Sequence, residues 1–534
     1  MDRNEGARRG GGDHRSGIAL LLGLSFAALA APLSAFATRA AAPAPASPAA
    51  PADAASKRPR LVLLVVIDQF RADYLDRFLP RFGPDGFKRL LGDGTLFTGC
   101  AYSYAFTETA PGHATIATGT TPDRHGVVAN EWWDAALGRT TEAIEDPEAP
   151  LFGPPGTTGA SPRRLLVETI GDVLRRETKG AAKVWAVAGK DRSAIFSAGL
   201  RPSGAVWYDK RNGRMVTSRY YATEPPEWLR RFNGARPAER LLRNEQVKDF
   251  SSLRTTPQFH DLLLRCARTI VASEQLGADD VPDLLMVGLS ATDLLGHEVG
   301  PFDDRLADLV VRLDGQLAGF LKFLDERVGP GRTIVALSSD HGVAPTRAQA
   351  IASGLTPPAL DRRRLRETLE RALAAAILGE KPAPRLHGAS STRLWFDDDE
   401  LARAGMTKEQ AEEIVGQAAA GIEGIAGWVT PRRTTVEASM AELYRLSRYA
   451  GRSPDLCLVP AEFAIDATGD PATHGSPWPY DRRVPLLFAG APFRHGARDE
   501  QPCSPADLAP TLAAALRIPP PAGATGRVLS SALP

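Results

Sequence analysis

Six side chains of the kind that bind metal ions are spread along most of this chain, and most of them follow an apolar segment. They are Asp68, Asp293, His297, Asp340, His341 and His474. The apolar segments are residues 61–68, 283–293 and 333–341, and each is typical of a buried strand. A parallel α/β sheet brings the carboxyl ends of its strands to one edge, so residues far apart in sequence can meet there. Three carboxylates and three imidazoles suit two divalent ions, and zinc is the first choice.

The pair Asp293 and His297 has a spacing that is typical of one face of a helix. Residues four apart are neighbours on a helix surface, so both side chains can reach one ion. Alone, this spacing is more often that of a solvated pair. The pair gains weight only from the other candidate ligands.

The neighbours Asp340 and His341 would point to opposite faces of a strand. They can converge only if the chain leaves the strand at this point, and Gly342 makes that easy. His474 lies in a loop of small residues. Several such features, each beside a strand end or a glycine turn, favour a shared site over chance.

The candidate nucleophiles are two hydroxyl groups, those of Thr107 and Thr109. A hydroxyl needs activation, which metal coordination or a helix N-terminus can supply. A short helix is expected from about Ala110, so Thr109 would lie at its start. The local sequence alone favours the interpretation of Thr109 as a simple helix cap. His113 and His125 flank this helix and are expected to hold loops by hydrogen bonds.

The elements that position these residues predict an α/β fold with a mostly parallel central sheet flanked by helices. The evenly apolar run at 60–68 indicates a central strand, and strands then alternate with helices. Further strands are expected at 183–189, 283–289, 333–338 and 484–490, and short ones near 391–396 and 455–459. Helices are expected from Ser161 to about Thr178 and at 258–275, 303–327, 361–377, 407–420 and 504–516.

A single catalytic domain is expected over residues 60–534. The helix–strand alternation is lost at about 200–257 and again at about 345–465, and both segments are interpreted as insertions. They are expected to cap the domain.

The N-terminus has the pattern of a secretory signal peptide. Basic residues precede an apolar stretch at 18–31, and an Ala-x-Ala cleavage pattern follows at 35–37. We therefore predict a signal peptide over 1–37 and an extended Pro/Ala linker over 38–59. A retained membrane anchor is the alternative, but the apolar stretch is shorter than the roughly 20 residues that a span needs. The expected location is periplasmic or secreted, with no stable membrane span after cleavage.

The bulk composition excludes some partners and leaves the cysteines open. The 534 residues contain 64 Lys and Arg against 63 Asp and Glu, so no strong field would attract nucleic acid. None of the four cysteines of the chain is in a Cys-x-x-Cys pair. An oxidising compartment permits disulfides, but the sequence does not choose among the pairings. It also makes no prediction of the oligomeric state.

The ordered set of motifs resembles the alkaline phosphatase superfamily. The motifs are 65-VVIDQFRADYL-75, 107-TETAPGHATIATG-119, 126-GVVANEWWD-134, 189-GKDRSAI-195, 290-SATDLLGH-297, 338-SSDHG-342 and 473-THG-475. They are most similar to those of the secreted, phosphate-irrepressible alkaline phosphatases that use threonine as nucleophile. The nucleotide pyrophosphatase/phosphodiesterases are a related branch.

The resemblance implies two Zn²⁺ sites. One set of ligands is Asp293, His297 and His474, and the other is Asp68, Asp340 and His341, with Thr109 also coordinating. It implies that Thr109 attacks phosphorus and forms a phospho-threonine intermediate, which a water activated by the first zinc hydrolyses.

The resemblance also implies the residues that bind the phosphate. Asn130 matches an asparagine that binds one phosphate oxygen, and Lys190 and Arg192 match a Lys-x-Arg pair that binds the others. Two positive charges suit the dianion of a monoester better than a diester, and the related phosphodiesterases lack this pair. Without the resemblance, residues 189–193 would be interpreted as a solvated turn. The Cys-x-Pro-x-Arg motif of sulfatases is absent.

The predicted function is that of a secreted zinc-dependent phosphomonoesterase, an alkaline phosphatase, that hydrolyses small-molecule phosphate monoesters in phosphate acquisition. One alternative is a phosphodiesterase or nucleotide pyrophosphatase on the same scaffold. A second alternative is a catalytically inactive secreted metal-binding protein.

Overall fold

The computed structural model describes residues 58–152, 158–244, 247–377, 380–388, 390, 392–466 and 470–534. The predicted signal peptide and all but the end of the predicted linker lie outside these residues. Within the described ranges, no helix is both long and apolar enough to cross a membrane.

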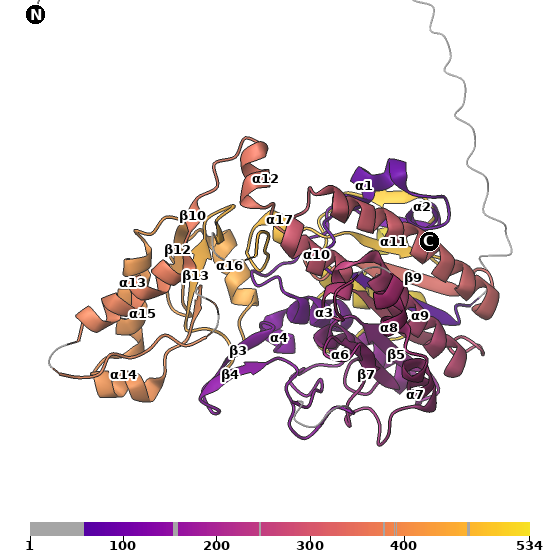
Figure 1. Cartoon of the computed structure of the whole chain (residues 1–534), viewed down its shortest axis with the longest axis horizontal. Helices are drawn as coiled ribbons and strands as arrows, with labels where there is room; N and C mark the ends of the chain where they lie inside the picture. The colour runs from indigo at the N-terminus through magenta and orange to yellow at the C-terminus, as the bar shows by residue number, and fades with distance from the viewer. Residues whose placement is uncertain are drawn as a thin grey trace, which may run out of the picture. The chain divides into compact units, whose positions relative to one another are not determined.

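A nine-stranded sheet forms the centre of the fold (Figure 1). Its strands, in spatial order, are β16 (Ala497–Asp499), β2 (Gly94–Phe97), β15 (Leu486–Ala489), β9 (Thr333–Ser338), β1 (Leu61–Ile67), β8 (Asp283–Leu289), β5 (Val184–Ala188), β6 (Gly204–Asp209) and β7 (Arg214–Val216). The five strands from β9 to β6 run parallel. The predicted α/β class with a mostly parallel sheet is therefore confirmed.

The three strands that precede the candidate carboxylates are neighbours at the middle of this sheet. β1 pairs in parallel with β8 on one side and with β9 on the other. Every residue of β1 and β8 is buried, because both faces of the sheet are covered. Their carboxyl ends therefore lie together at one edge.

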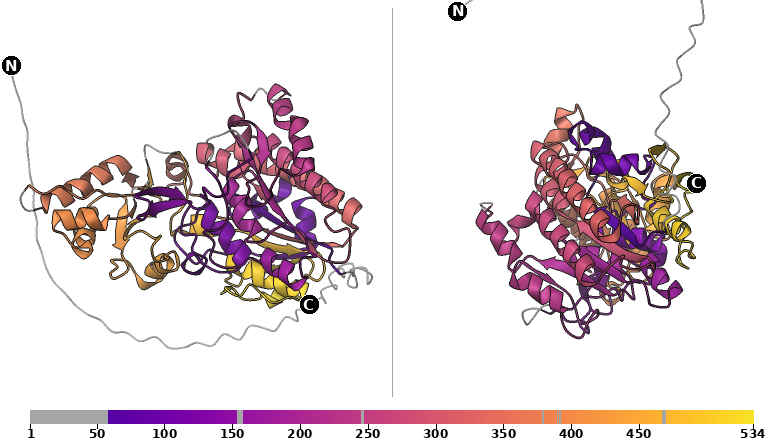
Figure 2. Two further views of the ribbon diagram at one scale, coloured as in Figure 1. Left: turned by 90° about the horizontal axis from the view of Figure 1, so that it is seen from below. Right: turned by 90° about the vertical axis from the view of Figure 1, so that its right-hand side faces the viewer.

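Helices cover both faces of the sheet (Figure 2). One face packs against α1 (Tyr74–Phe78), α2 (Phe87–Gly92), α7 (Glu227–Gly234), α8 (Pro237–Asn244), α9 (Pro257–Ser273), α10 (Ala291–Val299) and α11 (Asp304–Val328). The other face packs against α3 (Thr109–Thr118), α5 (Ile170–Glu177), α6 (Asp191–Ala198) and α18 (Leu508–Leu516). Alternate residues of β1 enter the two hydrophobic clusters, as the period of a strand requires.

The segment expected to be the second insertion has small sheets and a hydrophobic cluster of its own. Its elements are α12 (Arg347–Ala352), β10 (Ala359–Leu360), α13 (Arg362–Ala375), β11 (Arg393–Leu394), α14 (Asp398–Ala404), α15 (Lys408–Ala419), β12 (Ile425–Val429), α16 (Ala438–Leu446), β13 (Leu456–Pro460) and β14 (Ile465–Asp466). The hairpin of β3 (Glu131–Asp134) and β4 (Arg139–Glu142) reaches this segment (Figures 1 and 2). There Trp133 stacks on His387 with ring centroids 3.9 Å apart.

The remaining elements are short. They are η2 (Leu79–Arg81), α4 (Pro122–His125), η3 (Ser252–Thr255), α17 (Pro479–Arg482), η4 (Pro505–Asp507) and η5 (Ser530–Ala532).

Two expectations about local structure differ from the structure. The helix expected from Ser161 begins only at Ile170, because Thr169 forms a capping box with Asp172 while the Ser161 hydroxyl donates to Asp146. In the segment interpreted as the first insertion, strands β6 and β7 extend the central sheet. The domain limits themselves stay a prediction.

Candidate functional site

Two groups of side chains that can each hold a metal ion lie at the carboxyl edge of the central strands. One group is Asp293, His297 and His474, and the other is Asp68, Asp340 and His341. Within each group the candidate ligand atoms all lie within 4.8 Å of one another. The structure thus assembles the six predicted ligands into the two predicted sets.

Each of the three imidazoles presents the same nitrogen to the site. Nδ1 of His297, His341 and His474 lies 2.8, 3.0 and 2.8 Å from a backbone carbonyl oxygen. A carbonyl can only accept, so in the neutral ring Nδ1 carries the proton and Nε2 keeps its lone pair. Metal-binding histidines in proteins are oriented in this way.

Buried polar atoms without hydrogen-bond partners also point to a metal centre. Among the described residues, Oδ1 of Asp68, Oδ2 of Asp340 and Nε2 of His341 are buried and have no hydrogen-bond partner. Burial, and next the charge of Asp68, raise the pKa of Asp340 well above its usual range. Ionised carboxylates buried this close together need more positive charge than the single ammonium among them supplies. The donor set therefore fits two divalent cations.

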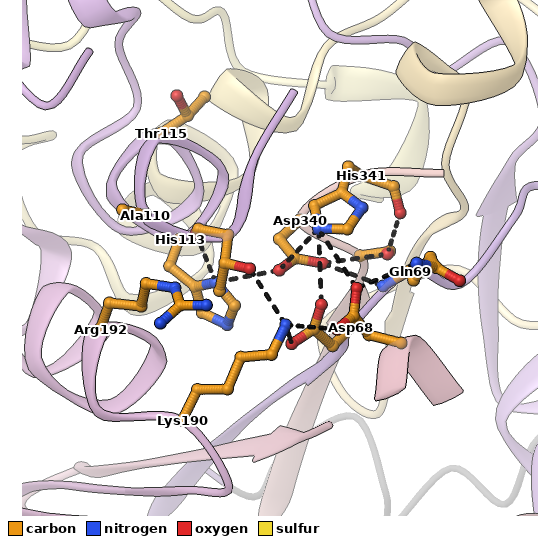
Figure 3. Close-up of polar contacts among 12 residues, drawn as sticks. Asp68, Gln69, Ala110, His113, Thr115, Lys190, Arg192, Asp340 and His341 are labelled. Atoms are coloured by element: carbon orange, nitrogen blue, oxygen red, sulfur yellow. Dashed lines mark hydrogen bonds and ion pairs between the residues drawn. The ribbon is translucent and has the colours of Figure 1, made fainter. Parts of the chain in front are cut away.

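Lys190 is that ammonium, and it lies between the two groups. Its Nζ is 2.7 Å from Oδ2 of Asp68 (Figure 3). The same Nζ is 2.6 Å from Oδ2 of Asp293. Burial by itself would lower the pKa of Lys190, but Asp293 and then Asp68 outweigh it and raise that pKa. The ammonium therefore stays charged, and it also donates to the Thr109 hydroxyl at 3.2 Å.

Thr109 is the first residue of α3, and Glu108 rather than Thr109 occupies the cap position. The alternative interpretation of Thr109 as a simple helix cap is therefore wrong. Its side chain is buried at the floor of a cleft, where the N-terminal end of the helix favours negative charge. Thr107, by contrast, donates its hydroxyl to the backbone of Ser476 at 3.3 Å.

Asn130 is held to the start of α3 by two hydrogen bonds. Its side-chain Oδ1 accepts from the backbone amide of Ala110 at 2.9 Å. The backbone amide of Asn130 donates to Oε2 of Glu108 at 2.7 Å. With Oδ1 occupied, the donor side of the Asn130 amide group is left for another partner. Arg393, from the 345–465 segment, pairs with the second oxygen of Glu108 at 2.5 Å.

A cleft of about 570 Å³ opens above these residues. Thr109, Asn130, Lys190 and Arg192 all line it, together with three members of the first metal-binding group. The volume is within the range of small-molecule sites. The cleft can therefore present a hydroxyl, an amide and two cations to one small ligand.

Two glycines let the backbone come close to the site. A Cβ on Gly112 would lie 2.3 Å from the Asp340 carbonyl oxygen, so α3 packs directly against the second metal-binding group. Gly342 was expected to let the chain leave the strand, but β9 already ends at Ser338. A Cβ at 342 would instead collide with the Tyr480 carbonyl oxygen at 2.2 Å, so close approach is what requires glycine there.

Of the two remaining histidines of this region, His125 holds a loop as predicted, whereas His113 lies within α3 and bonds to the same helix. His113 Nδ1 is hydrogen-bonded to the Thr109 carbonyl at 2.9 Å. His125 lies 3.1 Å from the Thr115 hydroxyl and accepts from the Val127 amide. Burial lowers the pKa of both rings, to about 4 and about 3, so both are neutral near pH 7.

Sequence reasoning missed several residues of the site. Gln69 has φ of 61° and connects the two metal-binding groups. Its backbone amide donates a hydrogen bond to Asp340, and its side-chain amide donates one to Asp293. Its place directly after Asp68 was a usable indication. Glu108 was visible beside Thr109, but no pattern marked Arg254, which lines the cleft from η3.

Comparisons with known proteins agree on one family. Residues 62–462 match the model of the type I phosphodiesterase / nucleotide pyrophosphatase family. Alkaline phosphatase PafA of Elizabethkingia meningoseptica is 30% identical over 531 residues, covering 89% of this chain and 95% of PafA. Alkaline phosphatase PhoV of Synechococcus elongatus is 30% identical over 524 residues, covering 89% of this chain and 93% of PhoV.

The solved structures agree with this result. The crystal structure of PafA superimposes with a TM-score of 0.83 at 28% identity and covers 89% of this chain and 99% of PafA. A PafA variant in which a threonine, an asparagine, a lysine and an arginine are replaced superimposes with a TM-score of 0.82 at 27% identity and the same coverage of both chains. Murine ectonucleotide pyrophosphatase / phosphodiesterase 5 shares the fold, with a TM-score of 0.52 at 17% identity. The match covers 86% of this chain and 95% of the murine chain.

Proposed function

The chain belongs to the type I phosphodiesterase / nucleotide pyrophosphatase family, within the alkaline phosphatase superfamily, and from that membership we propose that it is an alkaline phosphatase. It hydrolyses small-molecule phosphate monoesters with two Zn²⁺ ions and a phospho-threonine intermediate. It acts in the periplasm or outside the cell, after removal of residues 1–37.

One observation carries the proposal. The Thr109 hydroxyl lies at the start of a helix, 3.2 Å from a charged lysine that also contacts one carboxylate of each metal-binding group. A hydroxyl so placed can become an alkoxide, and an attached phosphoryl group would lie at the positive end of the helix. Thr109 would displace the alcohol in line, and water would then hydrolyse the phospho-threonine.

The two groups of ligands would hold the ions. Asp293, His297 and His474 would bind one, and Asp68, Asp340 and His341 the other. When bound, such ions supply Lewis acidity and stabilise charge on the attacking and leaving oxygens. Zinc suits ligand sets of nitrogen and carboxylate oxygen with an open position.

Three side chains would bind the transferred phosphoryl group. Asn130 has its Oδ1 occupied by Ala110, so its amide hydrogens can donate to a phosphate oxygen. Lys190 and Arg192 would bind the other oxygens. PafA has been solved with the same four residue types replaced, and there too the lysine and arginine are separated by one residue.

The two positive charges favour a monoester over a diester. A monoester is close to a dianion at neutral pH, whereas a diester carries one charge and a second organic group. The family name keeps phosphodiester or pyrophosphate hydrolysis as the second candidate. An inactive metal-binding protein is disfavoured, because the nucleophile and both ligand sets are intact.

The test compares turnover of a phosphate monoester with turnover of its methyl-blocked diester. We expect a strong monoester preference, and its loss in the double variant Lys190→Ala, Arg192→Ala. Each lost hydrogen bond to a charged group is worth about 1.5–3 kcal/mol, so monoester kcat/KM should fall by roughly two to four powers of ten. Diester activity should change much less. Equal falls for both substrates would favour the phosphodiesterase candidate.

A further inference from the structure

The wall of the cleft beyond the phosphate-binding residues carries an arginine that the proposed reaction does not use. Arg254 belongs to η3, which packs against α10, the helix that bears Asp293 and His297. Its side chain is half-buried and faces the same cleft as Thr109. Arg254 therefore lies next to the space that the alcohol portion of a substrate must occupy.

The charge of Arg254 is not neutralised by a carboxylate in the described part of the chain. Among the described residues its hydrogen bonds go only to its own turn, from Nε to the Ser251 carbonyl at 3.3 Å and from Nη2 to the Ser251 hydroxyl at 3.2 Å. Burial is the first cause that lowers the pKa of Arg254, and repulsion by Arg192 lowers it further. A guanidinium keeps its charge in spite of such shifts. Arg254 is thus a cation without an ion-pair partner among the described residues.

The other charges of this wall are largely satisfied by one another. The Asp191 carboxylate lies 3.5 Å from Nη1 of Arg192, and that of Asp209 lies 2.8 Å from Nε of Arg211. Burial, and next Asp191, raise the pKa of Glu142, so this carboxyl carries its charge less readily than an exposed one. Asp293 and Asp191 lie near enough to raise the pKa of Arg254, but no carboxylate of the described residues forms an ion pair with it.

Arg192 lowers the pKa of Arg254, whereas Asp293 and Asp191 raise it, so positive and negative charges both act on this guanidinium. The scissile phosphoryl group is expected at Thr109, with Arg192 on one of its oxygens. The cleft, of about 570 Å³, extends past this point to Arg254 and to the exposed Lys210. A ligand that fills it would bring a second part of its structure to Arg254.

We propose that Arg254 is a specificity-determining residue that binds a second anionic group on the substrate, either a carboxylate or a second phosphate. The preferred substrates are then phosphate monoesters whose alcohol portion is itself acidic. The inference rests on the proposed function, which it narrows to a class of substrate.

The test measures kcat/KM of the metal-loaded enzyme and of Arg254→Gln on three small substrates of similar size. Glycerol 3-phosphate has a neutral alcohol portion, 3-phosphoglycerate adds a carboxylate, and propane-1,3-diol bisphosphate adds a phosphate. Because charge-assisted hydrogen bonds from arginine are strong, the variant should lose about 10-fold or more on one or both of the doubly anionic substrates. Glycerol 3-phosphate should change by less than about threefold, since it has no group for Arg254.

Two further variants control the comparison. Arg254→Lys keeps a positive charge and should retain most of the preference for an acidic alcohol portion. Arg211→Gln removes a cation of the same cleft that is already paired with Asp209, and should leave the preference unchanged. Thermal unfolding and metal content of each variant show whether the fold is intact. Should Arg254→Gln not fold, the wild-type enzyme decides: KM for the doubly anionic substrates should rise more steeply with salt than KM for glycerol 3-phosphate.

The outcomes separate the two proposals. No turnover of any of the three substrates by the wild-type enzyme would overturn the proposed function itself. Turnover of all three substrates with equal kcat/KM, or an equal loss on all three in Arg254→Gln, would overturn the inference alone. A loss on 3-phosphoglycerate only, or on the bisphosphate only, identifies which anion Arg254 binds.

Discussion

Replacing Lys190 by methionine is expected to destabilise the metal-free protein much more than the metal-loaded protein. In the structure the Lys190 ammonium contacts Asp68 at 2.7 Å and Asp293 at 2.6 Å. The three side chains are 7%, 1% and 2% exposed, so water cannot replace the lost charge. Methionine keeps most of the length and volume of lysine and removes only the charge.

The size of the effect follows from this burial. Removing one partner of a buried ion pair costs about 3–5 kcal/mol, because the other charge is left uncompensated. For a domain of this size that is roughly 3–5 °C in melting temperature. With both metal ions bound, the carboxylates are neutralised by the ions, and the loss should be less than about 2 °C. By linkage, the variant should also bind metal more tightly than the wild type.

The assay is thermal unfolding, followed by circular dichroism, of wild type and Lys190→Met after chelation and after zinc loading. Lys183→Met is the matched control, since the Lys183 ammonium donates to the Glu274 carbonyl at 2.7 Å and touches neither metal-binding group. The melting temperature of Lys183→Met should fall by the same amount in the metal-free and the zinc-loaded protein. If Lys190→Met also lost the same amount in both states, the lysine would not be balancing the charge of an empty metal centre.

Three more predictions follow from the site and its surroundings. Trapping at low pH and peptide mapping should find phosphate on Thr109, and phosphate on Thr107 in an active Thr109→Ala variant would contradict the assignment. Zinc analysis should find two ions per chain, and His474→Ala should lose about one of them and most turnover, since catalytic zinc rarely has protein ligands to spare. Cys100 and Cys503 are paired in an isolated backbone β-bridge, so their side chains lie on adjacent segments. Oxidised glutathione should therefore link this pair by a disulfide, with peptide mapping under non-reducing conditions as the check. A linkage to either of the other two cysteines would contradict the structure.

The central part of the fold could be predicted because its sequence pattern is unusually plain. Strands β8 and β9 have the predicted bounds, and β1 lies within its predicted range, since evenly apolar runs suit strands that are covered on both faces. The spatial order β9-β1-β8 could not be predicted, because it depends on crossovers that leave no local pattern. Strand ends followed by carboxylates were nevertheless enough to predict a shared site.

The edges of the fold were harder to predict. β6 and β7 lie in a segment rich in Arg, Tyr, Trp and Pro, which hides the alternation of a strand. The expected helix from Ser161 failed for a different reason: the residue has the right type for a cap, but its hydroxyl is used by Asp146. Residue type alone does not reveal which partner a side chain has.

The same reasoning explains which part of the site escaped sequence analysis. Metal ligands and the nucleophile have chemistry that few other residue types can supply, so their types and spacing identify them. Arg254 and Arg393 have a common residue type, and what sets them apart is where they lie. Arg393 reaches Glu108, which in turn holds the amide of Asn130.

These two arginines come from the two segments interpreted as insertions, and each reaches a different side of the site. One lines the space for the alcohol portion of the substrate, and the other supports a residue that is expected to bind the phosphate. Changes in an insertion can therefore alter which alcohol portion is accepted, or how firmly the phosphate is held, while the candidate metal ligands stay in place at the carboxyl edge of the central sheet. Arg254→Gln should accordingly act on the choice between substrates, whereas loss of Arg393 should lower kcat/KM for all of them alike.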